Sequence, residues 1–249
     1  MKKLLIGGLS LLLLTACSPK STAKYSDLSA NEQYKVAMET FKKVSSYTAS
    51  VNVDMIMRYD SEEMSIPTVM DIKANNAQDI NAMEMEIHQT IEGMDQTMYL
   101  KDGYIYISLM GQNMKMAVAN EQIEELTKNA QVQEYDENMM NNLSSEVKDD
   151  LVYINFEMND AYLNDLLAQF MSVDELAEDV TVTIHSSKGT LITDINGNIV
   201  QNIMDIDMET TTDGMTIGLV MKTDMTYSDL NKTTISFPED LDSYVLTEE

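Results

Sequence analysis

The side chains best suited to acid–base or nucleophilic catalysis are few in this chain. It contains two histidines, one cysteine and 42 aspartates and glutamates among 249 residues. His88 and His185 fall on the polar positions of segments that alternate polar and apolar residues, which is typical of solvated surface histidines. The sequence also lacks a Gly-x-Ser-x-Gly motif, a phosphate-binding loop and a dinucleotide-binding fingerprint. We therefore expect no enzyme, and we interpret the many carboxylates as a solvated acidic face.

Two patterns could in principle hold a metal ion. Asp194-x-Asn196-x-Asn198 supplies oxygen ligands, but it lacks the glycine and the distal glutamate of a calcium loop, so a hairpin turn accounts for it better. Met-x-Met pairs place thioethers on one side of a strand, and thioethers suit Cu(I). Each pair also belongs to an apolar stripe, so core packing explains it better, and we expect neither a metal nor a cofactor. The pairs are Met55/Met57, Met83/Met85 and Met114/Met116.

The only cysteine, Cys17, gives the clearest chemical signal in the sequence. Lys2 and Lys3 precede an apolar run at residues 4–14, which is too short to cross a bilayer but suits the central region of an export signal. The run ends in Leu-Thr-Ala-Cys, which resembles the bacterial lipobox. That resemblance implies transfer of a diacylglyceryl group to the sulfur of Cys17, followed by cleavage before it.

Processing at this position predicts a signal peptide at 1–16, a small polar tether at 17–27 and a single domain at 28–249. No later segment has the roughly twenty apolar residues that a transmembrane helix requires. We therefore expect an extracytoplasmic protein that is anchored to the cell membrane through the lipid on Cys17, or to the outer membrane if the host has one. With its only cysteine lipidated, the mature chain can form no disulfide.

The composition is acidic and rich in methionine. The net charge is −26, and the chain has 22 methionines, four phenylalanines and no tryptophan. So acidic a surface repels nucleic acid and anionic headgroups. Hydrophobic residues make up 44% of the chain, which is enough for a core. Methionine is flexible and polarizable, so a cavity lined by it could adapt to varied apolar ligands.

Hydrophobic periodicity predicts mostly strands. Residues 51–59 and 83–91 alternate apolar and mostly polar positions, as long half-buried strands do. Asp102-Gly103 and Asn196-Gly197 are hairpin signals, and Pro67 marks a strand start or an edge. Two loosely similar β blocks result, at 47–118 and 178–237, with a further strand at 151–158. Three amphipathic helices are expected at 28–45, 121–128 and 159–171, and a long polar loop with at most one helical turn at 131–148.

These elements predict an α+β, β-dominated fold built on one large antiparallel sheet. Such a sheet commonly packs one face and leaves the other wet. Three helices are too few to cover so broad an apolar face, so we expect a cavity beside it. The residues expected to face a ligand there are Val53, Met55, Met57, Met83, Met85, Ile87, Met114, Met116, Leu219 and Met221.

The lipobox at Cys17, the strands at 51–59 and 83–91, the hairpin at 101–103 and the turn at 192–199 occur together here, before a Phe-Pro ending. In this combination the chain resembles the LolA/LolB and LppX/LprG class of envelope lipoproteins, and a little-characterised group of Met-rich bacterial lipoproteins. The resemblance implies a sheet curved as an open half-barrel, with about three helices covering its concave face and an apolar cavity that holds acyl chains.

Three functional hypotheses follow from these observations. The first is a carrier or sensor of lipids or other apolar molecules in the cell envelope. The second is a surface-displayed structural or protein-interaction module without a small-molecule ligand. A tightly packed, cavity-free sheet with an exposed apolar patch would favour this hypothesis. The third is an enzyme or metal carrier, which would require His88 and His185 to converge with carboxylates in one cleft. No interaction with nucleic acid is expected.

Overall fold

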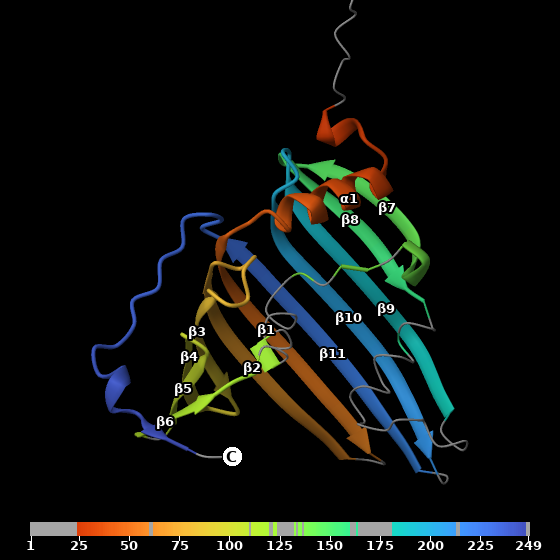
Figure 1. Ribbon diagram of the computed structural model, residues 1–249. Helices are drawn as coiled ribbons and strands as arrows, with labels where there is room; N and C mark the ends of the chain where they lie inside the picture. The colour runs from red at the N-terminus through yellow and green to blue at the C-terminus, as the bar shows by residue number, and fades with distance from the viewer. Residues whose placement is uncertain are drawn as a thin grey trace, which may run out of the picture.

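The computed structural model describes residues 24–59, 62–109, 111–119, 122–123, 132, 134–135, 137–159, 163, 181–212 and 215–247. These residues form a twelve-stranded sheet, an α-helix and short 3-10 helices (Figure 1). The helices are η1 (Tyr25–Asp27), α1 (Ala30–Phe41), η2 (Glu137–Met139) and η3 (Leu241–Ser243). The strands are β1 (Ser46–Tyr59), β2 (Glu62–Asn75), β3 (Glu84–Ile91), β4 (Met94–Lys101), β5 (Tyr104–Leu109), β6 (Gln112–Ala117), β7 (Met140–Lys148), β8 (Leu151–Met158), β9 (Thr181–Asp194), β10 (Ile199–Thr212), β11 (Met215–Ser228) and β12 (Val245–Leu246).

The sheet is open and almost wholly antiparallel. Its strand order is β12-β6-β5-β4-β3-β2-β1-β11-β10-β9-β8-β7, and only the short β12 runs parallel to its neighbour. Figure 1 shows a curved sheet whose two ends, near β6 and β7, stay apart. The prediction of a β-dominated α+β fold around one large antiparallel sheet is therefore confirmed. A half-barrel covered by three helices stays a prediction, because the helices expected at 121–128 and 159–171 lie mostly outside the described residues.

The first predicted helix is present as α1, shortened to Ala30–Phe41. Ser29 caps it: its hydroxyl accepts the N–H of Glu32, and the Glu32 side chain accepts the N–H of Ser29 in return. The buried side of α1 packs on the sheet beside β7, β8 and β10. At its end, the Phe41 ring lies 5.0 Å from that of Tyr227 and 5.7 Å from that of Tyr47, measured between centroids. The helix therefore covers one end of one face, which we call the inner face; the opposite side is the outer face.

The chain enters the domain at that same end. Tyr25 in η1 donates its hydroxyl to the Gln33 carbonyl oxygen at 3.1 Å and accepts the Thr193 hydroxyl at 3.0 Å. The Gln33 amide returns a hydrogen bond to the Tyr25 carbonyl oxygen at 3.1 Å. Tyr25 also covers Gly197 in the β9–β10 turn, where φ is +83°. These contacts fix the point from which the N-terminal segment leaves the body.

After β11, residues 229–247 cross the outer face; we call this segment the C-terminal strap. Phe237 packs on Tyr99 of β4, and Tyr244 packs on Tyr106 of β5, with ring centroids 6.0 and 5.7 Å apart. With Leu241 they form a second, small apolar cluster. The strap ends as β12, pairing with the edge of β6. From the sequence, only a Phe-Pro ending was recognised in this region.

Two sequence expectations need correction. The loop expected at 131–148 is wrong, because Met140–Lys148 is β7, an edge strand. Its polar composition suits an exposed edge, and a bulge at Asn141–Ser144 interrupts its pattern. Pro67 lies inside β2 and does not start a strand, but pairing with β3 begins only at Thr68. β2 is also an inner strand of the sheet, so Pro67 marks neither a strand start nor an edge strand. It is tolerated because it lies just beyond the last residue pair with β3, where no ladder N–H is required.

A glycine in β9 provides a test of this packing. A Cβ at Gly189 would lie 2.2 Å from the Phe156 ring, whereas a Cβ at Gly218 in β11 would make an ordinary 3.4 Å contact with Arg58. We expect Gly189→Ala to lower the free energy of unfolding by about 1–3 kcal/mol through overpacking. Gly218→Ala should change it by less than about 0.5 kcal/mol. Urea unfolding of both variants measures the difference, and equal losses would contradict the contact.

Candidate functional site

The cross-strand register gathers the predicted ligand-facing residues on the inner face. Met55 lies opposite Met221 of β11, and Met57 lies opposite Leu219, so these four side chains share a face. A second row on the same face starts at Ala49 of β1 and runs through β2 to β6, pairing Ile72 with Ile87, Ile87 with Met98, Met98 with Ile107 and Ile107 with Met114. Val53, Met85 and Met116 keep the same parity, and Met83 lies buried just before β3. The pattern thus forms a largely apolar surface, which Thr68, Thr223, Gln89 and Gln96 interrupt.

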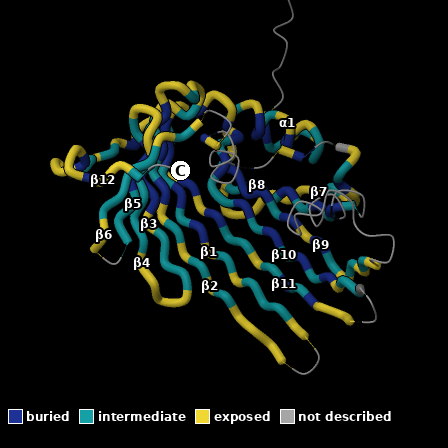
Figure 2. The backbone as a smooth tube through the Cα atoms, turned by 60° about the horizontal axis from the view of Figure 1, so that its bottom comes forward, coloured by how far each residue is buried: buried dark blue, intermediate teal, exposed yellow. Residues whose placement is uncertain are grey.

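The solvent exposure of the inner-face side chains increases along the strands with distance from α1. On β1 the inner-face exposure rises from 1% at Val51, through half-buried Met55, to 45% at Tyr59. On β11 it rises from buried Tyr227 to 53% at Met215. Figure 2 shows this change from buried to exposed backbone along the long strands. The inner face therefore has a sealed end under α1 and a more exposed end, where apolar side chains meet solvent.

The distal part of the inner face includes residues that sequence analysis missed. Met64 and Ile66 lie on β2 opposite Met57 and Met55, and Ile217 lies on β11 opposite Tyr59. Met64 is 49% and Ile217 is 45% exposed. The period-2 signal at Met64, Ile66, Met70 and Ile72 was present in the sequence, but Pro67 in the middle obscured it.

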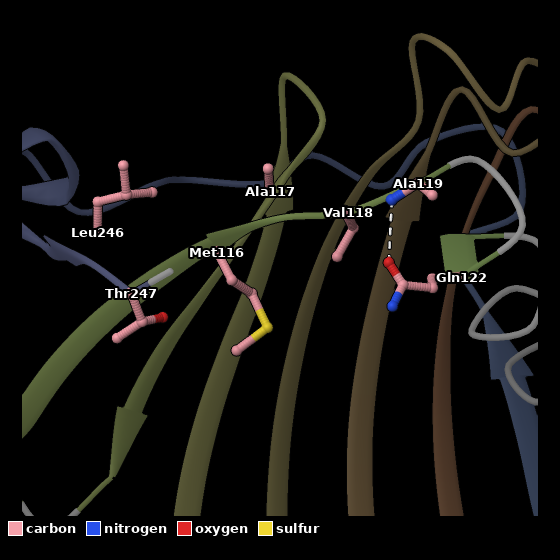
Figure 3. Close-up of a pocket in the computed structure, with 7 residues that line it drawn as sticks. All are labelled: Met116, Ala117, Val118, Ala119, Gln122, Leu246 and Thr247. Carbon is pink, nitrogen blue, oxygen red and sulfur yellow. Dashed lines mark hydrogen bonds between the residues drawn. The ribbon is translucent and has the colours of Figure 1, made fainter. Parts of the chain in front are cut away.

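A groove of about 520 Å³ lies where the inner face ends at β6 (Figure 3). On one side the chain leaves β6 through Val118 and Ala119, and on the other β12 supplies Leu246 and Thr247. The Thr247 N–H donates to the Lys115 carbonyl oxygen at 2.9 Å, which ties the two sides together. The lining is Met116, Ala117, Val118, Ala119, Gln122, Leu246 and Thr247. Of the predicted residues, only Met116 takes part.

The outer face carries a small polar network around Glu86. This carboxylate is 7% exposed and accepts hydrogen bonds from Lys73 Nζ at 3.0 Å and from His88 Nε2 at 2.7 Å. His88 Nδ1 lies 3.0 Å from the Thr97 hydroxyl. Burial raises the pKa of Glu86, but the hydrogen bonds and positive charges of His88 and Lys73 outweigh it and hold the pKa below its ordinary value.

The two histidines do not form one site. His88 lies on β3, and His185 lies on β9, where its Nε2 is 3.4 Å from a Glu209 carboxylate oxygen. Strands β2, β1, β11 and β10 separate them in the sheet. The convergence that the enzyme hypothesis required is therefore not present. Within the described ranges, no group of three or more histidine, cysteine, aspartate or glutamate residues could hold a metal ion.

The Asp194 turn also uses its oxygen atoms internally. Asp194 Oδ1 accepts the N–H groups of Asn196 and Asn198 at 2.8 and 2.9 Å, and Oδ2 accepts the Asn198 side-chain amide at 2.8 Å. Burial raises the pKa of Asp194, and these hydrogen bonds more than offset it, so the net shift is downward. The hairpin interpretation of this segment is confirmed, since it joins β9 to β10.

Comparisons with known proteins were made for family, sequence and structure. A family model described as "Family of unknown function (DUF6612)" matches residues 29–243. No curated protein matches the sequence. Among described segments, no helix has both the length and the apolar character needed to cross a membrane.

Several solved structures are similar to this chain. LprF from Mycobacterium bovis is 13% identical, with a TM-score of 0.47 over 84% of this chain and 96% of its own. A LolA superfamily protein from Nitrosomonas europaea is 12% identical, with a TM-score of 0.26 and coverages of 84% and 96%. An outer membrane lipoprotein-sorting domain from Vibrio parahaemolyticus, described as putative, is 11% identical, with a TM-score of 0.24 and coverages of 86% and 97%. The LolA superfamily and a lipoprotein-sorting domain are thus named among the structures to which this chain is similar, at TM-scores below 0.5.

The Glu86 network predicts a specific pH dependence of stability. Because the folded-state pKa of Glu86 is lowered, its contribution is present above its ordinary value of 4.5 and is lost as pH falls through the folded value. We expect wild type to be more stable than Glu86→Gln at pH 7, with the gap closing below about pH 4.5. Urea unfolding at stepped pH values measures the gap.

The control for this prediction is Glu63→Gln, which removes an exposed ion pair with Arg58 at 3.3 Å. At pH 7 it should cost less than about 1 kcal/mol, because surface ion pairs contribute little. A gap between wild type and Glu86→Gln that is absent at pH 7, or that widens toward acid, would contradict the assignment.

Proposed function

This chain belongs to the DUF6612 family, and we propose that it is a membrane-anchored extracytoplasmic lipoprotein that binds or carries a lipid or another apolar molecule on the inner face of its sheet. One observation carries the proposal. The apolar row of Met55, Met57, Leu219 and Met221 continues the buried core yet is only half-buried. A surface of this kind gains free energy when an apolar molecule covers it, by about 25 cal/mol for each Å² removed from water.

The chemistry of the face favours binding to varied apolar shapes. Methionine side chains have three rotatable bonds and a polarizable sulfur, so they can adjust to a ligand at little cost. Directly paired positions such as Met57 and Met64 bring two flexible side chains together across strands. The net charge of −26 disfavours anionic ligands, so we propose a neutral or zwitterionic one.

The proposed anchor leads into the sealed end of the domain. From Cys17 to Lys24 the chain can reach at most roughly 25 Å. It meets the body at η1, which is fixed to the β9–β10 turn. Each long strand, such as the 14-residue β1, extends about 45 Å from there. The exposed ends of β1, β2 and β11 lie at the other end of the body from η1 (Figure 1), which would present them to molecules in the envelope.

The second candidate is a protein-interaction module. Tyr59, Met64, Met215 and Ile217 form an exposed apolar patch at the distal end of the inner face. Patches of this kind also occur at protein–protein interfaces. Native mass spectrometry of the protein purified from its host separates the two candidates, since a carrier retains an apolar molecule and an interaction module does not.

A matched pair of β1 variants tests the binding face. Met57→Asp places a carboxylate on the inner face, whereas Ile56→Asp places one on the outer face at the next residue; both positions are half-buried. In the full chain with Cys17→Ser, we expect Met57→Asp to weaken binding of N-phenyl-1-naphthylamine about tenfold or more, because a buried charge must be desolvated. Ile56→Asp should stay within about twofold of the parent. Fluorescence titration measures this, and no uptake by the parent protein would refute the proposed function.

The anchor has its own test. Cys17→Ser removes the acceptor sulfur, so we expect the protein to lose label from an alkynyl fatty acid and to move from the membrane fraction to the soluble envelope fraction. Ser18→Ala, one residue later, should leave both properties unchanged. Continued membrane association of an unlabelled Cys17→Ser protein would contradict anchoring through this residue.

A further inference from the structure

The groove at the β6 edge differs from the rest of the inner face in having two walls. Residues that follow β6 form one wall, and β12 of the C-terminal strap forms the other. Figure 3 shows Leu246 and Thr247 at one end of the groove, Met116 and Ala117 in the middle, and Gln122 at the other end. Its volume of about 520 Å³ falls in the range of small-molecule sites.

The walls are apolar and lined by small residues. Ala117 and Ala119 leave space that larger side chains would fill, and Val118 packs against the main core. Met116 pairs with Ile105 on β5, so the groove continues the inner face. It therefore offers a narrow apolar channel at the border of the face for which we have proposed ligand binding.

One polar group stands at the end of this channel. Gln122 Oε1 accepts the Ala119 N–H at 2.9 Å, which fixes the orientation of the amide. Among the described residues, no acceptor pairs with Gln122 Nε2. The Thr247 hydroxyl, at the other end, donates to the Lys115 carbonyl oxygen at 3.2 Å. The groove thus combines apolar walls with a hydrogen-bond donor at one end.

The backbone groups along the groove exclude a peptide strand as its natural occupant. The Val118 N–H donates to the Gly103 carbonyl oxygen at 3.0 Å, and the Thr247 N–H donates to Lys115. The Ala119 N–H donates to Gln122 Oε1. A bound peptide would need such donors for strand pairing, whereas a hydrocarbon chain needs none.

We infer that this groove holds a single acyl chain of a neutral ester, whose carbonyl oxygen accepts a hydrogen bond from Gln122 Nε2. The inference rests on the proposed function and names its ligand subsite. The described residues that line the groove include no cationic side chain that could pair with a free carboxylate, which favours a neutral ester. Leu246 lines the groove on the β12 side and is 55% exposed. A bound acyl chain would cover this side chain.

The experiment compares variants of the full chain with Cys17→Ser, using cis-parinaric acid methyl ester as the fluorescent acyl probe. Ala119→Phe fills the groove from an exposed position, and Ala82→Phe makes the same change at an exposed turn elsewhere. We expect Ala119→Phe to weaken binding at least tenfold and Ala82→Phe to stay within twofold. Shortening the chain after Tyr244 removes the β12 wall but keeps its outer-face anchors, and should weaken binding to a similar extent.

Gln122→Leu separates the hydrogen bond from the cavity. It should lower affinity for the ester about threefold to tenfold, as expected for one lost hydrogen bond, and leave affinity for N-phenyl-1-naphthylamine unchanged. Circular dichroism confirms that each variant is folded.

The failures are distinguishable. If the ester binds and Met57→Asp weakens it while the groove variants bind like the parent, the groove inference is overturned and the proposed function stands. Tighter binding of cis-parinaric acid than of its ester would overturn the neutral-headgroup assignment. If the parent binds neither probe, the proposed function fails and the groove inference fails with it.

Discussion

The antiparallel register between β1 and β11 is the constraint on which the rest of this structure depends. It joins the first β block to the last one, and it sets Met55 against Met221 and Met57 against Leu219. A slip of one residue would turn every side chain of the slipped strand to the other face and would bring Asp54 of β1 or Asp224 of β11 into the apolar row. The outward positions of both strands are strongly polar, so such a slip would bury unpaired charge. The same alternation therefore specifies the fold and prepares the apolar inner face.

Unequal cover follows from where the aromatic residues lie. Phe41, Tyr47 and Tyr227 meet at the α1 end, and Phe156 packs beside Tyr34 and over Gly189. Large rings fill that end of the inner face, as aromatic side chains bury the most area. Toward the distal end, the residues change to methionine, leucine and isoleucine, with the exposed ring of Tyr59 at the end of β1. The sheet is thus rigidly packed where the chain enters and adaptable where apolar residues meet solvent.

Sequence reasoning found the elements whose signal is local. Alternation at 51–59 and the turns at Gly103 and Gly197 sufficed, because strand period and positive φ are properties of neighbouring residues. It failed for β7, whose polar composition reflects an edge position that only the finished sheet defines. It placed Met116 on the apolar face but not in the groove, because the opposite wall, Leu246, comes from a part of the chain about 130 residues away. The face of the sheet on which a side chain lies can be predicted from the sequence, whereas contacts between segments far apart in the chain cannot.

Under the proposed function, the two faces divide stability and binding between them. On the outer face, the strap buries Tyr99 and Tyr106, and Glu86 is held by Lys73 and His88. These contacts connect β2, β3, β4 and β5 without using any inner-face side chain. A ligand can therefore occupy or leave the inner face without breaking the bonds that hold those strands together. The groove is formed by elements of both faces, because β12 belongs to the strap on the outer face and lines a groove that continues the inner face. Movement of the strap is thus the one outer-face event that should reach the ligand directly, through Leu246.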